Sequence, residues 1–293
     1  MTTYCGRVTV CGKTNVGKST LLNLLLKEKL YIVSPKPQTT RHSIIGILTE
    51  PPYQIIFSDT PGVIEKPAYK LQEVMERQRR NAVAEADIVL WMVESNDLAA
   101  LSEKRLYNSF KNKKIIMCIN KIDLLKNKDL LLPVIDSYKN LGIENIFPIS
   151  ALKNDGVACV KECILKYLPQ APFLYPEDYI TEHPERFFVS EIIREKIFFL
   201  FHKEVPYSTA VRIEDMKERE SGKTYIRATI IVERDSQKAI LIGEKGSAIK
   251  KIGESARKDI ERFINRPVFL DLHVKTVKKW RKRFQVNNFL EPK

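Results

Sequence analysis

The sequence predicts an α/β protein built from two unequal domains, and three patterns carry this prediction. Short apolar runs alternate with longer amphipathic ones over residues 1–168, a proline-rich segment then interrupts them, and a different order of elements follows. Apolar runs that lack polar alternation are typical of a parallel sheet covered by helices on both faces. A length of 293 residues suits about two domains, although one domain of this size also occurs.

The first domain, residues 1–168, is predicted to hold a mostly parallel sheet with helices between its strands. The strands are expected at Val8–Val10, Gln54–Ser58, Ile88–Val93, Ile115–Ile119 and Ile146–Ile149. Prolines at 169, 172 and 176 exclude a continuous helix across the next segment. Residues 169–184 are therefore predicted to be a linker.

The second domain, residues 185–274, is predicted to be a smaller α+β unit. Its expected elements are a helix at Glu185–Phe201, strands at Ala210–Ile213 and Tyr225–Glu233, a short helix ending at Leu241, a helix at Ser247–Phe263 and a strand through Val268, Leu270, Leu272 and Val274. Helical spacing predicts core-facing stripes in its two long helices. These stripes consist of Phe188, Ile192 and Ile197–Phe199 in the first helix, and Ile249, Ile252, Ala256, Ile260 and Phe263 in the second.

Charge is concentrated near the end of the chain. The net charge is +13, and residues 238–293 alone carry 15 Lys and Arg against 6 Asp and Glu, a balance of +9. Such a balance favours polyanionic partners, either nucleic acid or an acidic membrane surface.

Five cysteines without a Cys-x-x-Cys pair predict neither a disulfide framework nor a zinc site. No apolar run of 18 residues and no signal peptide is found, so we expect a cytoplasmic protein.

Residues 12–19, GKTNVGKS, match the phosphate-binding loop G-x-x-x-x-G-K-[ST] between a strand and a helix. Lys18 is expected to reach the β- and γ-phosphates, and the Ser19 hydroxyl is a candidate Mg²⁺ ligand. The loop alone does not distinguish ATP from GTP. The expected nucleotide contacts are Gly12, Asn15, Val16, Gly17, Lys18, Ser19 and Thr20.

The tetrapeptide NKID, which contains Asn120, Lys121 and Asp123, favours guanine over adenine. It follows a predicted strand, at the sheet edge where ligands bind in such folds. The Asp123 carboxylate can accept hydrogen bonds from the N1–H and 2-amino groups of guanine, which adenine lacks. Ser150 and Ala151, within ISA, end the last strand and are expected to touch the guanine oxygen.

Two further segments are expected to surround the γ-phosphate. In DTPG, Asp59 is a candidate Mg²⁺ ligand and Gly62 can turn its N–H toward the phosphate. In QTTRH, residues 38–42, Thr40 is the predicted metal ligand and Thr39 the alternative. The catalytic set is thus Lys18, Thr40, Asp59 and Gly62, and the metal set is Ser19, Thr40 and Asp59. Val63 cannot orient water, so we expect slow intrinsic hydrolysis, on the order of 10⁻⁴ to 10⁻² s⁻¹.

These motifs, in the order GKTNVGKS, QTTRH, DTPG, NKID and ISA, resemble those of the translation-factor-related small GTPases. The resemblance is to the Era family in particular, and it rests on QTTRH together with DTPG and on SEIIREK at residues 190–196. Lys13 and Thr14 depart from the loop that this family commonly carries, at positions that are neither glycines nor metal ligands.

The predicted second domain contains a G-x-x-G loop at residues 243–246 between two helices. Such a loop can serve as a plain turn, but it also lets an RNA backbone approach main-chain N–H groups, as in KH domains. The order of elements resembles a KH domain of the bacterial type, type II. The expected RNA contacts are Ile242, Gly243, Glu244, Lys245, Gly246, Lys250 and Lys251.

Residues 275–293 form a basic tail in which Trp280 lies within KTVKKWRKRF, residues 275–284. The Trp280 ring could stack on a base of single-stranded RNA, or it could dock on the core of the second domain. The sequence leaves both readings open.

The resemblance to the Era family implies a GTPase that uses GTP, GDP and Mg²⁺. It also implies binding to 16S rRNA near its 3′ end and a role in assembly and maturation of the 30S subunit. We expect a monomer without a DNA partner, and the resemblance allows peripheral contact with the inner membrane. The alternatives are a membrane-surface or cell-cycle signalling GTPase with a structural KH domain, and a tRNA-modifying GTPase, which the absence of a terminal catalytic cysteine motif disfavours.

Overall fold

The computed structural model describes residues 2–34, 36, 39–64, 67–96, 104–219 and 222–282. Gln38 of the QTTRH motif and residues 283–293 of the basic tail lie outside these ranges. The chain divides into a first unit, Met1–Lys66 with Val74–Glu182, and a second unit, Pro67–Glu73 with His183–Lys293. The boundary at Glu182 falls inside the segment 169–184 that the prolines mark in the sequence.

The first unit contains a six-stranded sheet in the order β2-β3-β1-β4-β5-β6. Its strands are β1 (Tyr4–Cys11), β2 (Ile44–Glu50), β3 (Tyr53–Asp59), β4 (Ile88–Glu94), β5 (Lys114–Asn120) and β6 (Ile146–Pro148). Its α-helices are α1 (Lys18–Leu26), α2 (Lys70–Glu85), α3 (Lys104–Phe110), α4 (Leu131–Lys139) and α5 (Val157–Tyr167). All neighbouring strands are parallel except β2 and β3, so the predicted mostly parallel sheet is confirmed.

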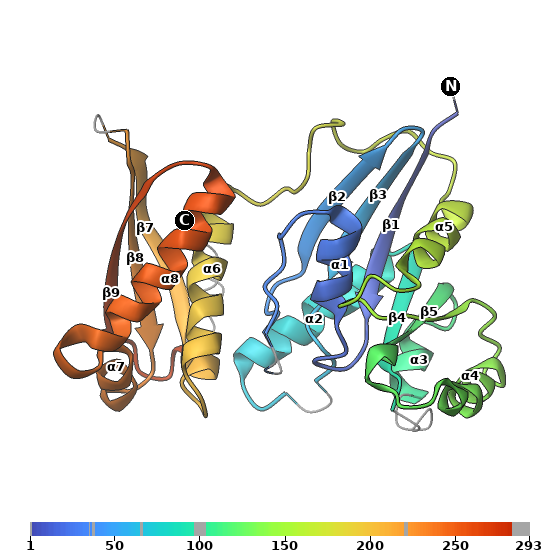
Figure 1. Ribbon diagram of the computed structural model, residues 1–293, viewed down its shortest axis with the longest axis horizontal. Coiled ribbons are helices and arrows are strands. Elements are labelled where there is room, and N and C mark those ends of the chain that lie inside the picture. The colour runs from blue at the N-terminus through green and yellow to red at the C-terminus, as the bar shows by residue number, and fades with distance from the viewer. Residues whose placement is uncertain are drawn as a thin grey trace. The chain divides into compact units, whose positions relative to one another are not determined.

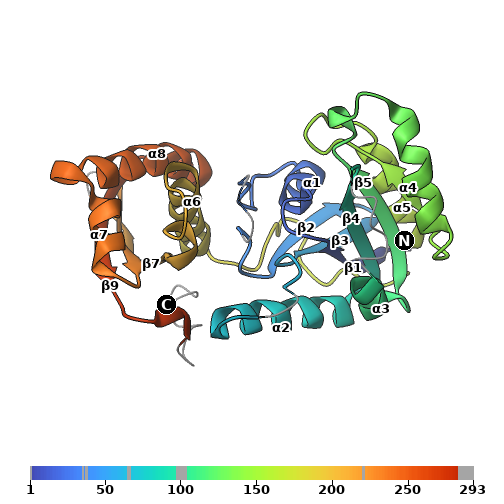
Figure 2. The same cartoon turned by 90° about the horizontal axis from the view of Figure 1, so that it is seen from below.

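Helices cover both faces of this sheet (Figure 1). Figure 2 shows α1 and α2 on opposite sides of the strands. Trp91 of β4 packs in a core cluster with side chains of α2, α3 and α4, including Val83, Phe110 and Tyr138. Because the parallel strands share one direction, their carboxyl ends bring the loops after β1, β3 and β5 to one edge of the sheet.

Strand β2 is absent from the sequence prediction, because only part of it is buried and its apolar run is broken by Gly46. It lies at the edge of the sheet, where the segment expected to be a linker packs against it. The Ile47 amide donates to the Ile180 carbonyl over 2.9 Å, and the Thr181 hydroxyl donates to the Ile45 carbonyl over 2.7 Å. Residues up to Glu182 therefore belong to the first unit.

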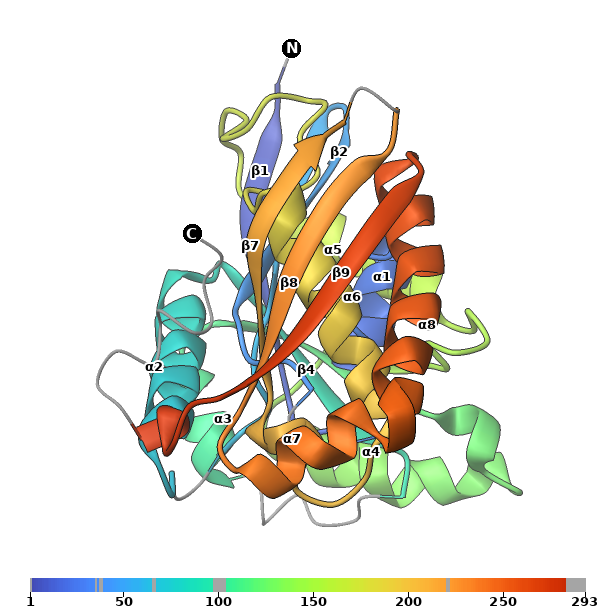
Figure 3. The ribbon, with the colours of Figure 1, turned by 90° about the vertical axis from the view of Figure 1, so that its left-hand side faces the viewer.

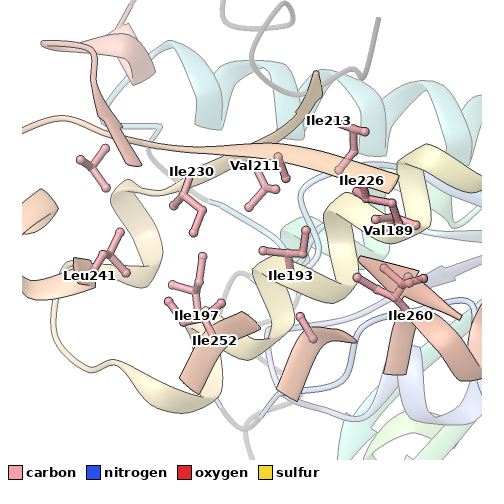
Figure 4. Packing of buried hydrophobic residues seen from close by; sticks show 14 of the residues in the cluster. Val189, Ile193, Ile197, Val211, Ile213, Ile226, Ile230, Leu241, Ile252 and Ile260 are labelled. Carbon is pink, nitrogen blue, oxygen red and sulfur yellow. The ribbon is translucent and has the colours of Figure 1, made fainter. Parts of the chain in front are cut away.

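The second unit has the predicted order of elements. Its α-helices and strands are α6 (Glu185–Leu200), β7 (Ala210–Glu218), β8 (Thr224–Val232), α7 (Asp235–Ile242), α8 (Ser247–Ile264) and β9 (Val268–Thr276). The three strands form a sheet in the order β7-β8-β9, antiparallel between β7 and β8 and parallel between β8 and β9. Figure 4 shows the core, which contains Ile193 and Ile197 of α6, Ile252 and Ile260 of α8, and Ile230 of β8.

Two predicted core positions in this unit are wrong. Phe199 is 51% exposed because it follows Phe198 on a different side of α6. Ile249 is only half-buried and lies outside the core cluster, since it sits in the first turn of α8 beside the G-x-x-G loop. Of the two possibilities for Trp280, the structure shows docking on the second unit. The Trp280 ring is buried, and its indole N–H donates to the Ser208 carbonyl over 2.9 Å.

Candidate functional site

The loop between β1 and α1 requires glycine at two positions, because it passes close to residues of β4 and β5. Gly12 and Gly17 have φ angles of 150° and 101°. A Cβ atom at Gly12 would lie 2.2 Å from the Met92 carbonyl oxygen, and one at Gly17 would lie 2.2 Å from the Asn120 side-chain nitrogen. Any other residue would push the loop away from its neighbours, so the loop is held close to the ends of β4 and β5.

Lys18 occupies the first position of α1, where a polyanion would be bound. Its side chain is buried, and its Nζ donates to the carbonyl oxygens of Gly12 over 3.2 Å and Lys13 over 2.7 Å. Gly17 at the N-cap supplies no side-chain cap, so the first amides of α1 stay available to a ligand. An ammonium group next to open helix amides suits the phosphates of a nucleotide.

Three oxygen-bearing side chains meet beside Lys18. The Ser19 hydroxyl donates to Asp59 Oδ2 over 2.7 Å, the Thr40 hydroxyl donates to the same oxygen over 3.2 Å, and the two hydroxyls are 3.3 Å apart. The Thr39 hydroxyl instead donates to the Lys36 carbonyl over 2.7 Å. The structure thus brings Thr40 rather than Thr39 to the other two candidate metal ligands.

The Asp59 carboxyl is the charged centre of this group. It is fully buried, and within the described part of the chain its Oδ1 has no hydrogen-bond partner. Burial raises the pKa of Asp59 above its ordinary value, while the nearby Lys18 charge opposes that rise. A buried carboxylate oxygen with an unused lone pair beside two hydroxyls fits a hard cation such as Mg²⁺.

The described chain contains no metal centre built from His, Cys, Asp and Glu side chains alone. In the ranges that the structure covers, no group of three or more His, Cys, Asp or Glu side chains could hold a metal ion. A site with one carboxylate and two hydroxyls would draw further ligands from phosphate and water. Mg²⁺ is commonly bound in this way.

The DTPG segment lies against the phosphate loop. A Cβ atom at Gly62 would lie 2.5 Å from Thr14 Cγ2 and 3.0 Å from the Thr14 amide nitrogen. The Thr60 hydroxyl donates to the Val10 carbonyl over 2.7 Å and fixes the segment to the end of β1. Val63 packs against the core cluster that includes Trp91, so its side chain offers no group to orient water.

Asn120 joins three parts of the site. Its side-chain N–H donates to the Val16 carbonyl over 2.7 Å, and its Oδ1 accepts from the Ala151 amide over 2.9 Å. All of these groups are buried. The asparagine of NKID therefore fixes the phosphate loop to the ISA segment, in addition to any contact that it makes with a nucleotide.

The Asp123 carboxylate is accessible to a nucleotide base. Its side chain is exposed, and Oδ1 accepts a hydrogen bond of 2.5 Å from the buried Ser150 hydroxyl. This bond orients the carboxylate and leaves its second oxygen for the donor edge of guanine. The structure brings Asn120, Asp123, Ser150 and Ala151 together.

The sequence analysis missed Glu94 and Ser95, which hold Lys121. The Lys121 backbone has a φ angle of 68°, its Nζ pairs with the Glu94 carboxylate, and the Ser95 hydroxyl donates to its carbonyl over 3.1 Å. Glu94 ends β4 directly opposite Asn120 of β5. That position at the carboxyl edge of the sheet was the available signal.

The G-x-x-G loop of the second unit forms a turn between α7 and α8. Gly243 and Gly246 have φ angles of 71° and 80°, and a Cβ atom at Gly243 would lie 2.8 Å from the Ala248 amide nitrogen. Glu244 and Lys245 between them are exposed. Gly246 caps α8 without a side chain, which leaves the first amides of that helix open.

The remaining predicted RNA contacts lie next to this loop. Lys250 and Lys251 are exposed in the first turns of α8, and Ile242, which ends α7, is half-buried. The structure therefore gathers all seven residues at one end of the second unit. An RNA backbone there would meet open amides and two ammonium groups.

The fold and these two sites together define a class of protein: a P-loop GTPase joined to a KH domain. Residues 7–121 match the family described as 50S ribosome-binding GTPase, and residues 204–281 match the family described as KH domain. The chain is 43% identical over 280 residues to the GTPase Era of Halothermothrix orenii, with 95% of each chain covered. It therefore belongs to the Era family of GTPases.

Other similar proteins agree with this assignment. The chain is 43% identical to the chloroplastic GTPase ERA1 of Zea mays and spans 67% of the length of that relative. A crystal structure of an Aquifex aeolicus Era variant bound to GDP·AlF4⁻ has a TM-score of 0.94, 40% identity and 98% coverage of each chain. A structure of Era with MgGDPNP and nucleotides 1506–1542 of 16S ribosomal RNA has a TM-score of 0.94, 41% identity and the same coverage.

Proposed function

We propose that this chain binds and hydrolyses GTP with Mg²⁺, binds 16S rRNA near its 3′ end and assists assembly and maturation of the 30S subunit. The observation that carries the proposal is the likeness, over 98% of both chains, to an Era structure that holds MgGDPNP and a 16S rRNA segment. The buried carboxylate and hydroxyls of the first unit and the open G-x-x-G loop of the second unit support it independently.

In the nucleotide site we assign each residue a role that its position permits. Lys18 and the amides of α1 bind the phosphates, Gly62 offers its N–H beside Thr14, and Asp123 selects guanine. Ser19, Thr40 and Asp59 would hold Mg²⁺, which when bound neutralises charge on the phosphate oxygens. Because Val63 cannot position water, intrinsic turnover is slow, on the order of 10⁻⁴ to 10⁻² s⁻¹. A single-turnover rate of several per second would reject this assignment.

We infer that the Thr40 segment is coupled to the second unit through β2 and the residues that precede His183. Strand β2 begins at Ile44, just after Thr40, and its edge carries the bonds to Ile180 and Thr181. The second unit begins two residues later, at His183. A nucleotide that orders Thr40 thus acts on the strand that holds the linker, and RNA must in turn strengthen GTP binding by the factor by which GTP strengthens RNA binding.

The experiment that tests the RNA assignment is a salt titration of binding to single-stranded RNA from nucleotides 1506–1542. We expect log affinity to fall against log salt with a slope of about −0.7 for each phosphate contact. Replacing Glu244 and Lys245 by aspartates should abolish binding, because negative charge then faces the phosphates. Aspartate tolerates positive φ, so it suits the Lys245 backbone, where φ is 49°.

A matched control changes the same charge elsewhere. Lys128→Asp lies on the surface of the first unit and should leave RNA affinity unchanged. If the Glu244 and Lys245 double variant binds RNA as tightly as this control, the assignment of the groove is wrong.

The same titration with anionic vesicles tests the alternative that the protein is a membrane-surface GTPase. The basic tail is compatible with this alternative. Among the described residues, no helix combines the length and the apolar character that crossing a bilayer would require. Vesicle binding without specific RNA binding would favour the membrane function instead.

A further inference from the structure

The three-stranded sheet of the second unit has an outer face that its helices leave uncovered. Alternate residues of β8 and β9, such as Ile226 and Leu270, point to the core, so their neighbours Tyr225 and Phe269 point the other way. Figure 3 looks onto this outer face, with α6 behind the strands. The core cluster thus occupies one side of the sheet only.

Planar groups stack on this outer face. Tyr225 and Phe269 are partners across β8 and β9, with ring centroids 6.0 Å apart and 19° between their planes. The Arg219 guanidinium carbon lies 4.0 Å from the Tyr225 centroid and 5.5 Å from the Phe269 centroid. Phe269 is 53% exposed, and it lies on the edge strand β9. An aromatic ring is therefore held in place by its neighbours while much of its surface stays open.

The charges on this face leave an excess of cations. The acids are paired within it: Glu214 with Arg212, Asp215 with Lys217, and Asp271 with Arg227. Arg219, Lys223 and Lys275 have no acidic partner among the residues that the structure describes. Uncompensated cations around an exposed aromatic ring are the combination by which proteins hold single-stranded nucleic acid.

We propose that Arg219, Lys223, Tyr225 and Phe269 form a second contact for single-stranded RNA, which we call the aromatic platform. One base stacks on Phe269, while Arg219 and Lys223 neutralise flanking phosphates. The inference rests on the proposed RNA binding at the G-x-x-G loop and extends it to a surface outside that groove.

The platform and the G-x-x-G loop lie near opposite ends of α8. This helix has 18 residues, so it is about 27 Å long at about 1.5 Å per residue. Its first turn follows Gly246, and β9, which carries Phe269, starts shortly after its last turn. A KH groove holds about four nucleotides. Nucleotides outside that clamped segment would therefore occupy the platform.

The test compares tetranucleotides with dodecanucleotides from nucleotides 1506–1542 of 16S rRNA. Phe269→Ala should weaken the best dodecanucleotide about tenfold, which is about 1.4 kcal/mol, because one stacked base is lost. Its effect on the best tetranucleotide should be negligible. Phe269→Leu keeps an apolar side chain on the sheet but removes the ring, so it should show the same loss if stacking is the cause.

Phe199→Ala is the matched control. Phe199 is as exposed as Phe269, at 51%, but lies on α6, away from the sheet face, and its removal should change neither affinity. Fluorescence of the buried Trp280 reports in each case whether the second unit is folded. As a second readout, Arg219→Gln should reduce the slope of log affinity against log salt by about 0.7 for the dodecanucleotide.

Equal dodecanucleotide affinities for Phe269→Ala, Phe269→Leu and Phe199→Ala would overturn the platform. The platform would also be overturned if Phe269→Ala weakened only binding to anionic vesicles, or only self-association of the protein, and left RNA affinity unchanged. A different result would refute the proposed RNA binding at the G-x-x-G loop. In that case the Glu244 and Lys245 double variant would bind tetranucleotides as tightly as the unmodified protein does. A 2-aminopurine base scanned along the dodecanucleotide should lose fluorescence at one position outside the clamped segment, and Phe269→Leu should restore it.

Discussion

Replacing Asn120 by alanine would show how far the nucleotide site depends on one buried amide. The change removes the bond of 2.7 Å to the Val16 carbonyl and the bond of 2.9 Å from the Ala151 amide. Each orphaned buried group costs about 1–3 kcal/mol. With partial recovery by water, we expect the free energy of unfolding of the first unit to fall by about 2–4 kcal/mol. GDP affinity should fall as well, since the phosphate loop loses its attachment to the base-binding loops.

Urea unfolding followed by tryptophan fluorescence measures this effect. The two tryptophans lie one in each unit, so a Trp280→Phe background leaves Trp91 as the reporter of the first unit. Asn140→Ala is the control, because this exposed asparagine makes no side-chain hydrogen bond in the described structure. An Asn120→Ala stability within about 0.5 kcal/mol of the control, the usual range for surface changes, would refute the reasoning.

Four further predictions concern other groups of the two units. Thr181→Val removes the hydroxyl that donates to β2, so the ratio of RNA affinities in GTP analogue and GDP should move toward one, whereas Thr181→Ser should preserve it. Burial raises the pKa of Cys11 to about 11. Because an unfolded thiol ionises near pH 8.5, the buried Cys11 thiol should lower the unfolding free energy of the first unit by about 1.4 kcal/mol per pH unit between about 9 and 11, and Cys11→Ala should remove this contribution to the slope. Alkylation near neutral pH should label the exposed Cys159 before Cys11, as mass spectrometry can test. Trp280→Ala should cost the second unit about 3–5 kcal/mol in urea unfolding, and an unchanged midpoint would contradict its docking on the core.

Much of the fold could be predicted because the buried strands read as continuous apolar runs. The runs that end at Cys11, Asp59 and Asn120 precede the three motifs that meet at one sheet edge, so their proximity followed from parallel order alone. Strand β2 could not be found in this way, since an edge strand with partial burial leaves a weak pattern. Ile249 fitted helical spacing, but a helix end beside an open loop has no core to face.

The candidate site was predictable in its residue types but less so in its connections. From the motif alone, the hydroxyls of Thr39 and Thr40 are equally suited to bind a metal. Only the fold directs the Thr40 hydroxyl to Asp59 and the Thr39 hydroxyl to the Lys36 carbonyl. The support that Glu94 gives to Lys121 crosses from β4 to β5, and such a long-range contact has no local signature. The aromatic platform is similar, because Tyr225 and Phe269 are far apart in sequence and meet only in the sheet.

Calorimetric titration of the unmodified protein with GTP and with ATP, both in excess Mg²⁺, tests the central claim most directly. The Asp123 carboxylate, oriented by Ser150, should favour GTP by roughly 10⁴-fold, because adenine presents no donors to it. Equal affinities for the two nucleotides, or no measurable binding of either, would contradict the account.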